Sequence, residues 1–557
     1  MSQASAPSPV IRCFPFGGVG EFGKNMMVYA IDDEAIIVDI GLGFPDAGQH
    51  GINIVIPDIT ALDALGLKIH GIVLTHGHED HIGGLPFILP KLKLPVWGTP
   101  ITLALVKHKM SETSYKPDLH PLPEDGTLTQ VGSFQVEAIP VTHSIMDAVS
   151  IAIHTPLGAI IHTGDFKFDP SPLDGRATAL HRFAKLGDEG VLLLCSDSTN
   201  APRSGSSPSE SSVGAPLKQA ISQCSGKVIV STFSSNMFRI QQIVDAAIAC
   251  GRSVAFAGRS LEKNVEISKL MGRLNLPDNK VVNVKQTEGI PDNELLIVAT
   301  GSQGEWRAAL SRIAQDNFPK LRLGVGDLVI FSSSSIPGNE RLIAGLFNHI
   351  YRRGARILHA GQAHLHVSGH AQAHELKTMI QLTRPKYMYP VHGEYRNLVE
   401  HQHLAVATNV PFENTIIAEN GHSVEVTDEG IKHGPDFHVG GVFVDDSGRD
   451  ELDYAVLKDR RSLADEGIIT VVVLIDQHSG KVIGEPELLT RGVLNDEVSE
   501  ETFEEAAASL RHHLEQLNQE ILADMDSAKE EVRLFVRRWC KKRLRRRPMV
   551  LTTILEV

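Results

Sequence analysis

The 557-residue chain is poor in several residue types, and each shortage excludes a class of protein. It has only five cysteines and no C-x-x-C pair, which argues against a disulfide framework and a thiolate zinc site. Aromatic residues make up 5%, and no apolar run approaches the ~18 residues of a membrane span. Residues Met1 to Pro9 lack the basic and apolar regions of a secretory signal. We therefore expect a cytoplasmic protein with reduced thiols and no membrane segment.

Basic residues are also in deficit, because 53 Lys and Arg face 67 Asp and Glu, for a formal charge of −14. A uniformly basic coat for nucleic acid is excluded, whereas a local basic channel is not. The hydrophobic fraction of 42% and the charged fraction of 22% are typical of globular proteins and exclude a mainly disordered or fibrous chain. The length predicts three or four domains.

The texture of the sequence changes twice along the chain. Residues 1–208 alternate short β-rich runs with turns and some helical patterns. Residues 209–353 alternate strands with helices at a spacing typical of a parallel sheet covered on both faces. Residues 354–430 return to the His- and Gly-rich texture of the first region. This order predicts an α/β protein in which one domain is inserted into another.

The C-terminal part predicts a separate small α/β domain. Residues 431–458 are polar and rich in Gly and Asp, so we expect a linker there. Residues 459–557 hold a strand pattern at Gly467–Asp476, a helical stretch at Glu500–Arg546 and a last strand at Val550–Val557.

Four candidate metal ligands follow the apolar strand Gly71–Leu74, namely His76, His78, Asp80 and His81. Imidazole and carboxylate groups suit zinc or manganese without any cysteine. His76 and His78 point the same way in an extended backbone, while Asp80 and His81 can face a second metal. A His-rich surface loop is the alternative, but a strand and four ligands rarely occur in this order by chance.

Three more candidate ligands each follow a strand-like run: His143, Asp165 and His392. Taken singly, each is more often a cap or a hydrogen-bonded polar residue. Taken with the first four, they complete two divalent-ion sites about 3.5–4 Å apart with a shared carboxylate. Such a pair generates hydroxide at neutral pH and stabilises a phosphoryl oxygen, so the set predicts a hydrolase.

This motif set resembles the metallo-β-lactamase superfamily, which implies an αββα sandwich. The resemblance assigns His76, His78 and His143 to one metal, Asp80, His81 and His392 to the other, and Asp165 to a bridge between them. It also implies that Asp39 is a carboxylate that orients the ligands. We expect two zinc ions, with manganese or magnesium as alternatives.

The long gap between Asp165 and His392 holds the predicted insertion, which resembles the β-CASP branch of nucleic-acid-cleaving enzymes. The branch's motifs match this sequence around Asp197, at His366–Ala371 and around His392. More closely, the chain resembles bacterial ribonuclease J. The segments that carry this likeness are Gly17–Asn25, Ser231–Asn236, Thr300–Glu305, Phe331–Glu340 and Arg547–Val550. One departure is Phe238, where we expect the family to have His.

The ribonuclease J resemblance implies a 5′→3′ exonuclease that favours 5′-monophosphate RNA, has additional endonuclease activity and serves RNA maturation and decay. Asp80, Asp197 and His370 would be catalytic. The residues expected to bind the 5′ phosphate and RNA are Ser333, Ser334, His366, Ser368, Gly369 and His370. If the backbone is extended, His366 and His370 share one face. His370 can bind the terminal phosphate or protonate the leaving oxygen. Ser333 and Ser334 belong to the serine run Ser332–Ser335, for which an ordinary loop is the alternative.

The predicted partner is single-stranded RNA. The resemblance also implies a homodimer or homotetramer formed through the C-terminal domain, with RNA-decay proteins or ribosomes as further partners. The segment Arg533–Arg547 carries nine basic residues. It can contact RNA or a partner, or form a solvated helix face beside the acidic first half.

Three alternatives share the metal motif. A small-molecule metallohydrolase has no use for the insertion. A catalytically weak RNA-binding subunit of the same fold does not require the filled ligand positions. A β-CASP nuclease acting on DNA is opposed only by the likeness along the whole chain.

Overall fold

The computed structural model describes residues 9–557 apart from 46–48, 50, 337, 446–450, 453, 478, 480, 495, 519–520 and 523. The chain divides into two compact units, each described here by itself. The first comprises residues 1–43 and 56–441, and the second residues 44–55 and 442–557. Among the described residues, no helix is both long and apolar enough to cross a membrane.

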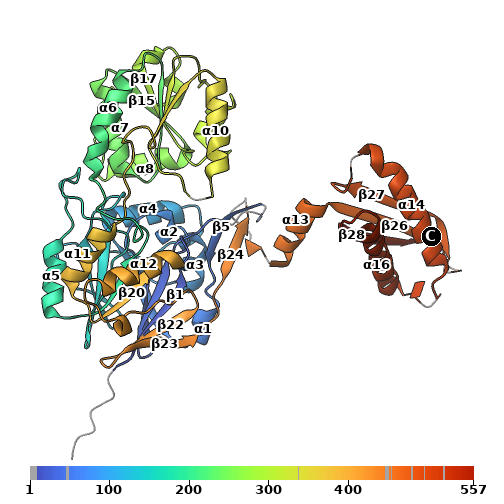
Figure 1. Cartoon of the computed structure of the whole chain (residues 1–557), viewed down its shortest axis with the longest axis horizontal. Helices are drawn as coiled ribbons and strands as arrows, with labels where there is room; N and C mark the ends of the chain where they lie inside the picture. Colours follow the sequence, from blue (N-terminus) through green and yellow to red (C-terminus); the bar gives the residue numbers. More distant parts are fainter. Residues whose placement is uncertain are drawn as a thin grey trace, which may run out of the picture. The chain divides into compact units, whose positions relative to one another are not determined.

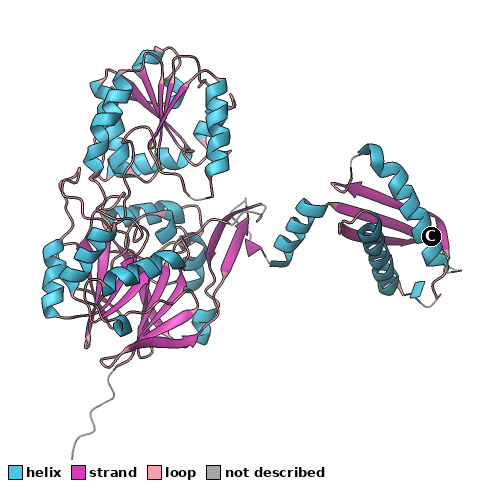
Figure 2. Ribbon diagram, viewed as in Figure 1, coloured by secondary structure: helices cyan, strands magenta, loops and turns pink. Residues whose placement is uncertain are grey.

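The first unit contains two sheets that pack face to face (Figures 1 and 2). The larger sheet has the order β23 (Ile431–Asp436), β22 (His422–Val426), β1 (Ile11–Gly17), β3 (Met26–Ile31), β4 (Glu34–Val38), β6 (Lys68–Val73), β7 (Val96–Gly98) and β8 (Leu119–Pro121). The smaller has the order β20 (Tyr387–Val391), β13 (Val191–Asp197), β12 (Gly158–His162), β11 (Val149–Thr155), β10 (Phe134–Pro140) and β9 (Thr129–Val131). Their inner faces share one core, in which Tyr29 of β3 and Ile151 of β11 are fully buried.

Helices lie outside both sheets. Those outside the smaller sheet are α5 (Leu180–Glu189), α11 (Ala373–Thr383) and α12 (Tyr395–Val406). Along the chain, α1 (Ala61–Ala64) precedes β6, α2 (Glu79–Ile82) and α3 (Leu85–Leu92) lie between β6 and β7, and α4 (Pro100–Met110) lies between β7 and β8, both of which it contacts. The predicted αββα sandwich is therefore confirmed. Phe183 of α5 and Met379 of α11 show why, since both bury apolar side chains against the outer face of the sheet.

The insertion forms a six-stranded parallel sheet within the first unit. Its order is β16 (Val281–Val282), β15 (Ser253–Ala257), β17 (Leu295–Ala299), β14 (Val228–Ser231), β18 (Leu328–Phe331) and β19 (Arg356–His359). One face is covered by α6 (Gly214–Ser222), α7 (Met237–Ala249) and α8 (Arg259–Leu270), and the other by α9 (Ala309–Ala314) and α10 (Glu340–Arg352). Alternate strand residues serve the two cores, as Val228 and Ile229 do, so the strands read as continuous apolar runs.

The chain builds one side of this sheet from β14 through β17 and then crosses to β18 and β19. A topological switch point therefore lies at the carboxyl ends of β14 and β18, where ligands bind in open parallel sheets. Strand β19 joins this sheet, although we predicted residue 353 as the limit of the insertion. Our other domain limits stay predictions.

The second unit has a three-stranded sheet in the order β27 (Val482–Arg491), β26 (Ile468–Ile475) and β28 (Met549–Glu556). Helices α14 (Asp496–Glu515) and α16 (Met525–Arg543) pack on one face, where Val471, Leu510 and Val536 share a core. A separate small sheet consists of β5 (Ile52–Pro57), β24 (Gly441–Asp445) and β25 (Glu451–Leu452). Helix α13 (Tyr454–Glu466) follows β25 in the chain.

Two expectations for this part of the chain were wrong, and one strand was not predicted. Residues 431–458 contain β23, β24, β25 and the start of α13. Strand β23 has no buried residue, so its polar side chains resemble those of a linker. The predicted single helical stretch Glu500–Arg546 is not continuous: α14 ends at Glu515 and α16 begins at Met525, where the side chain of Asp524 accepts a hydrogen bond from the Ser527 N–H and caps α16. We did not predict β27, whose mostly exposed residues lack a clear alternation.

Candidate metal centre

The candidate ligands follow the ends of strands that converge at one edge of the sandwich. Strands β12, β13 and β20 are parallel neighbours, with His162, Cys195 and Tyr389 in register. Their carboxyl ends therefore bring Asp165, Asp197 and His392 to the same place. The structure brings together all seven predicted ligand side chains: His76, His78, Asp80, His81, His143, Asp165 and His392.

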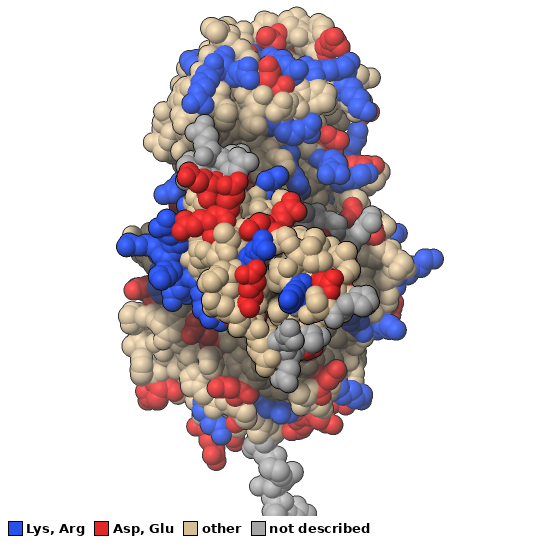
Figure 3. All heavy atoms as spheres, turned by 90° about the vertical axis from the view of Figure 1, so that its right-hand side faces the viewer, with Lys and Arg blue, Asp and Glu red and all other residues tan. Residues whose placement is uncertain are grey.

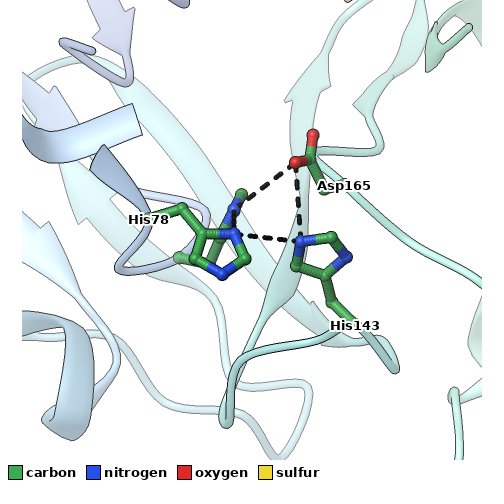
Figure 4. A group of neighbouring side chains, drawn as sticks. His78, His143 and Asp165 are labelled. Atoms are coloured by element: carbon green, nitrogen blue, oxygen red, sulfur yellow. Dashed lines mark hydrogen bonds and ion pairs between the residues drawn. The ribbon is translucent and has the colours of Figure 1, made fainter. Parts of the chain in front are cut away.

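The first group contains three imidazoles and one carboxylate. His78 Nδ1 lies 3.1 Å from both His76 Nε2 and His143 Nε2. Asp165 Oδ2 lies 3.5 Å from His76 Nε2 and 3.6 Å from His143 Nε2. Figure 4 shows His78, His143 and Asp165 pointing toward one another. Ligands about 2.0–2.1 Å from a tetrahedral zinc ion stand about 3.3–3.4 Å apart, so this spacing fits such an ion.

The protonation of these three rings also suits a cation. Burial lowers the pKa of His78 to about 4. Burial, reinforced by the charge of His81, lowers the pKa of His76 well below its ordinary value, and burial with His78 does the same for His143. Neutral imidazoles offer the lone pairs that a metal requires.

The second group shares the carboxylate of the first. His81 Nε2 lies 3.3 Å from Asp165 Oδ2 and 3.5 Å from Asp80 Oδ2, and His392 Nε2 lies 3.5 Å from Asp80 Oδ2. Burial lowers the pKa of His392, but Asp165 and the other nearby carboxylates outweigh burial and raise it to about 10. Burial likewise opposes protonation of His81, but the same carboxylates raise its pKa well above its ordinary value. A dication would supply the positive charge that protons supply to this group here.

Hydrogen bonds behind the rings fix which nitrogen faces the centre. Asp39 accepts from His81 Nδ1 at 2.7 Å and from the Thr75 N–H and hydroxyl at 2.8 and 2.7 Å. The Gly369 carbonyl is 2.8 Å from His143 Nδ1. Asp39 and His392 adopt left-handed backbone conformations, with φ of 61° and 54°, which are uncommon for non-glycine residues. The oriented rings match the support that metal-bound histidines receive in proteins.

Asp197 and His370 form a pair beside the two groups. His370 Nδ1 is 2.9 Å from Asp197 Oδ2 and 4.0 Å from Asp165 Oδ2. Burial lowers the pKa of His370, but Asp197 and Asp165 outweigh burial and raise it. With Nδ1 held by Asp197, the opposite nitrogen Nε2 is left for another partner.

The serine run lies at the switch point of the inserted sheet and meets the segment that ends at His370. The Ser332 hydroxyl donates to the Leu365 carbonyl at 2.7 Å. Ser333 is buried and Ser334 is exposed. The Asn200 amide donates to the Ser368 hydroxyl at 2.8 Å, which ties that segment to the motif of Asp197.

His366 and His370 have different surroundings, because residues 365–370 form no strand and the expected shared face is not formed. Burial and the cations Arg239, Lys167 and Arg203 lower the pKa of His366 to about 3. Its buried Nδ1 has no hydrogen-bond partner. A polar nitrogen without a partner, surrounded by positively charged side chains, suits a bound anion.

Sequence reasoning missed several residues that hold the site. The Asn25 amide lies 3.0 Å from the Asp80 carbonyl and 3.2 Å from His81 Nε2. The Ser207 hydroxyl donates to the His370 carbonyl at 2.5 Å. Asn25 lies within a segment that we quoted for the family likeness, but no ligand chemistry singled it out.

Arg239 is the largest missed contributor, and it is fully buried. Its guanidinium pairs with Glu210, with Nε 2.7 Å from Oε1 and Nη2 3.0 Å from Oε2. Nη1 donates to the Ser332 hydroxyl and to the Leu365 carbonyl, each at 2.7 Å. Arg239 thus joins the serine run to the 365–370 segment. Its neighbour Phe238 is 9% exposed and lines a cavity that His143 also lines.

Four family models match consecutive parts of the chain. They are "Metallo-beta-lactamase superfamily" at residues 19–198, "Ribonuclease J, beta-CASP domain" at 225–350, "Zn-dependent metallo-hydrolase RNA specificity domain" at 359–417 and "Ribonuclease J C-terminal domain" at 455–557.

Similar curated proteins carry one name. A ribonuclease J of Mycolicibacterium smegmatis is 38% identical over 100% of both chains. A ribonuclease J of Helicobacter pylori strain J99 is 36% identical over 97% of this chain and 78% of its own length. A solved structure of a protein of unknown function from Enterococcus faecalis V583 has a TM-score of 0.52 at 15% identity, covering 75% of this chain and 100% of that one. It shows likeness of fold alone.

We expect Asp39→Asn to weaken metal binding about 10–100-fold, because His81 would lose the carboxylate that orients its ring. Competition with a chromophoric chelator measures this affinity. The exposed Asp63 supplies the matched control, Asp63→Asn, which should bind metal as the unmodified chain does. Equal affinities for the two variants would contradict the role of Asp39.

Proposed function

The chain belongs to the ribonuclease J family, and from this premise we propose that it degrades single-stranded RNA from the 5′ end, favouring a 5′ monophosphate. The observation that carries this proposal is the contact between the serine run and the segment that ends at His370. This contact supports a pocket for the 5′ phosphate one short segment away from the candidate metal centre. RNA maturation and decay are the roles that such an enzyme would serve.

We propose two divalent cations, with zinc favoured by the imidazole-rich first group and manganese or magnesium as alternatives. His76, His78 and His143 would hold one, Asp80, His81 and His392 the other, and Asp165 would contribute to both. When bound, such a pair lowers the pKa of water and stabilises negative charge on phosphoryl oxygens. The shared position of Asp165 Oδ2, within 3.6 Å of ring nitrogens from both groups, supports this assignment.

His370 would act on the leaving group. Its Nδ1 is held by Asp197, so Nε2 is free to donate a proton to the departing 3′ oxygen of RNA. Asp197 would orient the ring and favour its charged form. Asp80 would contribute to catalysis by holding the second cation close to the reacting phosphate. The alternative role for His370, binding the terminal phosphate, uses the same pair.

The 5′ phosphate would lie between the serine run and His366. Ser333, Ser334 and the backbone of Ser368 and Gly369 offer donors there. The cations around His366 supply positive charge that the chain as a whole lacks. A pocket that admits only a chain end favours processing from that end, and each cut leaves a new 5′ phosphate. Endonuclease activity would require RNA to pass the serine run without such an end.

We also propose self-association through the open face of the C-terminal sheet. Alternate residues face away from the helices, and Leu474, Ile483, Leu489, Leu551 and Leu555 are each at least 36% exposed. Adjacent strands align these side chains, with Thr470 paired to both Leu489 and Leu551. An apolar sheet face of this kind is more stable when covered. RNA-decay proteins and ribosomes remain predicted partners.

His370→Ala should lower RNA hydrolysis about 10²–10⁴-fold, because the leaving oxygen would lose its proton donor. Metal content should not change, since His370 belongs to neither metal set. Release of nucleotides from RNA labelled at the 5′ end measures the rate, and the exposed His374 supplies the control His374→Ala. Full activity of His370→Ala would refute the assignment.

Arg239→Lys should raise the KM for 5′-monophosphate RNA, with little effect on 5′-hydroxyl RNA. Lysine retains the charge opposite Glu210 but cannot also hold Ser332 and Leu365. The control is Arg252→Lys, at another buried arginine that bonds only carbonyls outside the serine run. Equal KM changes for both RNAs would indicate a purely structural role for Arg239.

Leu551→Asp should shift the protein to smaller assemblies in sedimentation velocity, since a charge on the sheet face opposes its burial. Leu270, which is 79% exposed on α8, provides the control Leu270→Asp. Unchanged sedimentation of Leu551→Asp, or an equal shift in both variants, would contradict this interface.

A further inference from the structure

Trp306 lies in the inserted domain, and 69% of the residue is exposed. It follows β17 in the loop at the carboxyl edge of the parallel sheet. The Arg307 guanidinium carbon lies 4.4 Å from the centre of its ring. An exposed indole with a cation on it combines a flat apolar face with positive charge.

This loop is attached to the serine run. The Gln303 amide donates to the Ser334 carbonyl at 2.9 Å and its oxygen accepts from the Ile336 N–H at 2.8 Å. A Cβ on Gly304 would meet the carbonyl carbon of Leu342 at 2.6 Å, so the loop lies directly against the first turn of α10. Ile336 and Leu342 are 42% and 53% exposed, which adds apolar surface near Trp306.

The serine run lies between Trp306 and the candidate catalytic pair. Its first member, Ser332, bonds the segment that leads to His370, whereas Ser334 and Ile336 bond the loop that leads to Trp306. The serine run is therefore bonded on one side to the segment of His370 and on the other to the loop that carries Trp306.

The segment of the inserted domain that carries Trp306 is basic, although the chain as a whole is acidic. Residues 295–359 carry eight Lys or Arg against four Asp or Glu, in a chain whose formal charge is −14. Figure 3 shows Lys and Arg side chains spread over the inserted domain, the upper part of that view. A nucleotide combines a negative charge with a flat apolar face, so it matches this surface.

We propose that Trp306, with Arg307 stacked on it, is a platform on which a base of the RNA stacks beyond the serine pocket. The inference rests on the proposed function, because it takes RNA as the substrate. Stacking accepts every base, so the platform would add affinity without sequence preference. It would engage the nucleotide next to the bound phosphate and help to hold the RNA during successive cuts.

Intrinsic fluorescence tests this platform directly, because the chain has three tryptophans. In a Trp97→Phe, Trp539→Phe double variant of the metal-loaded protein, Trp306 is the only indole left. Titration with 5′-phosphorylated phosphorothioate RNA, which resists hydrolysis, should quench this emission. If the double variant does not fold, the difference between the unmodified protein and Trp306→Phe gives the same signal.

Affinities for the same RNA provide the second measurement. Trp306→Ala should bind about tenfold more weakly, while Trp306→Phe should retain most of the affinity because a phenyl ring also stacks. Phe412 is similarly exposed, at 65%, and supplies the control Phe412→Ala, which should bind normally. Absent quenching, or equal binding by Trp306→Ala, would overturn the platform. Failure of the unmodified enzyme to hydrolyse RNA would instead refute the proposed function.

Discussion

The arrangement of the candidate metal centre depends on one oxygen atom, Oδ2 of Asp165. It lies between 3.3 and 3.6 Å from ring nitrogens of His76, His81 and His143, which come from two different parts of the larger motif set. A buried carboxylate in that position requires compensating positive charge, and protons on His81 and His392 or a pair of cations can supply it. The surrounding fold is built to keep these groups in that arrangement.

The arrangement is preorganised by neutral groups as well as charged ones. Strands β12, β13 and β20 deliver three side chains to one edge because they are parallel and in register. Asp39 and the Gly369 carbonyl then select the ring nitrogens that face inward. These hydrogen bonds cost little additional conformational entropy, since the packing of the two sheets already orders the backbone.

The inserted domain brings the serine run close to the segment that ends at His370. Its switch point sets the serine run opposite Leu365, and buried Arg239 joins the two. The same edge of the sheet carries Trp306 on its far side. Hydrogen bonds therefore connect the segment that ends at His370, the serine run and the loop that carries Trp306.

The sequence by itself determined the parts of this protein that depend on local pattern. Apolar runs within residues 209–353 predicted a parallel sheet, and its strands include Ser253–Ala257 and Leu295–Ala299, because a strand buried on both faces has a continuous apolar signal. Side-chain chemistry identified the candidate ligands, since few residue types bind divalent ions. Exposed strands such as β27 carry no such signal and were missed.

Only the tertiary structure decided which groups meet across long stretches of chain. Asn25 beside His81, Arg239 beside Leu365 and the separate surroundings of His366 and His370 depend on how sheets pack and loops close. Polar side chains have no periodicity that reveals their partners, because a hydrogen bond is set by position in space. Folding supplies that position, which the order of residues does not display.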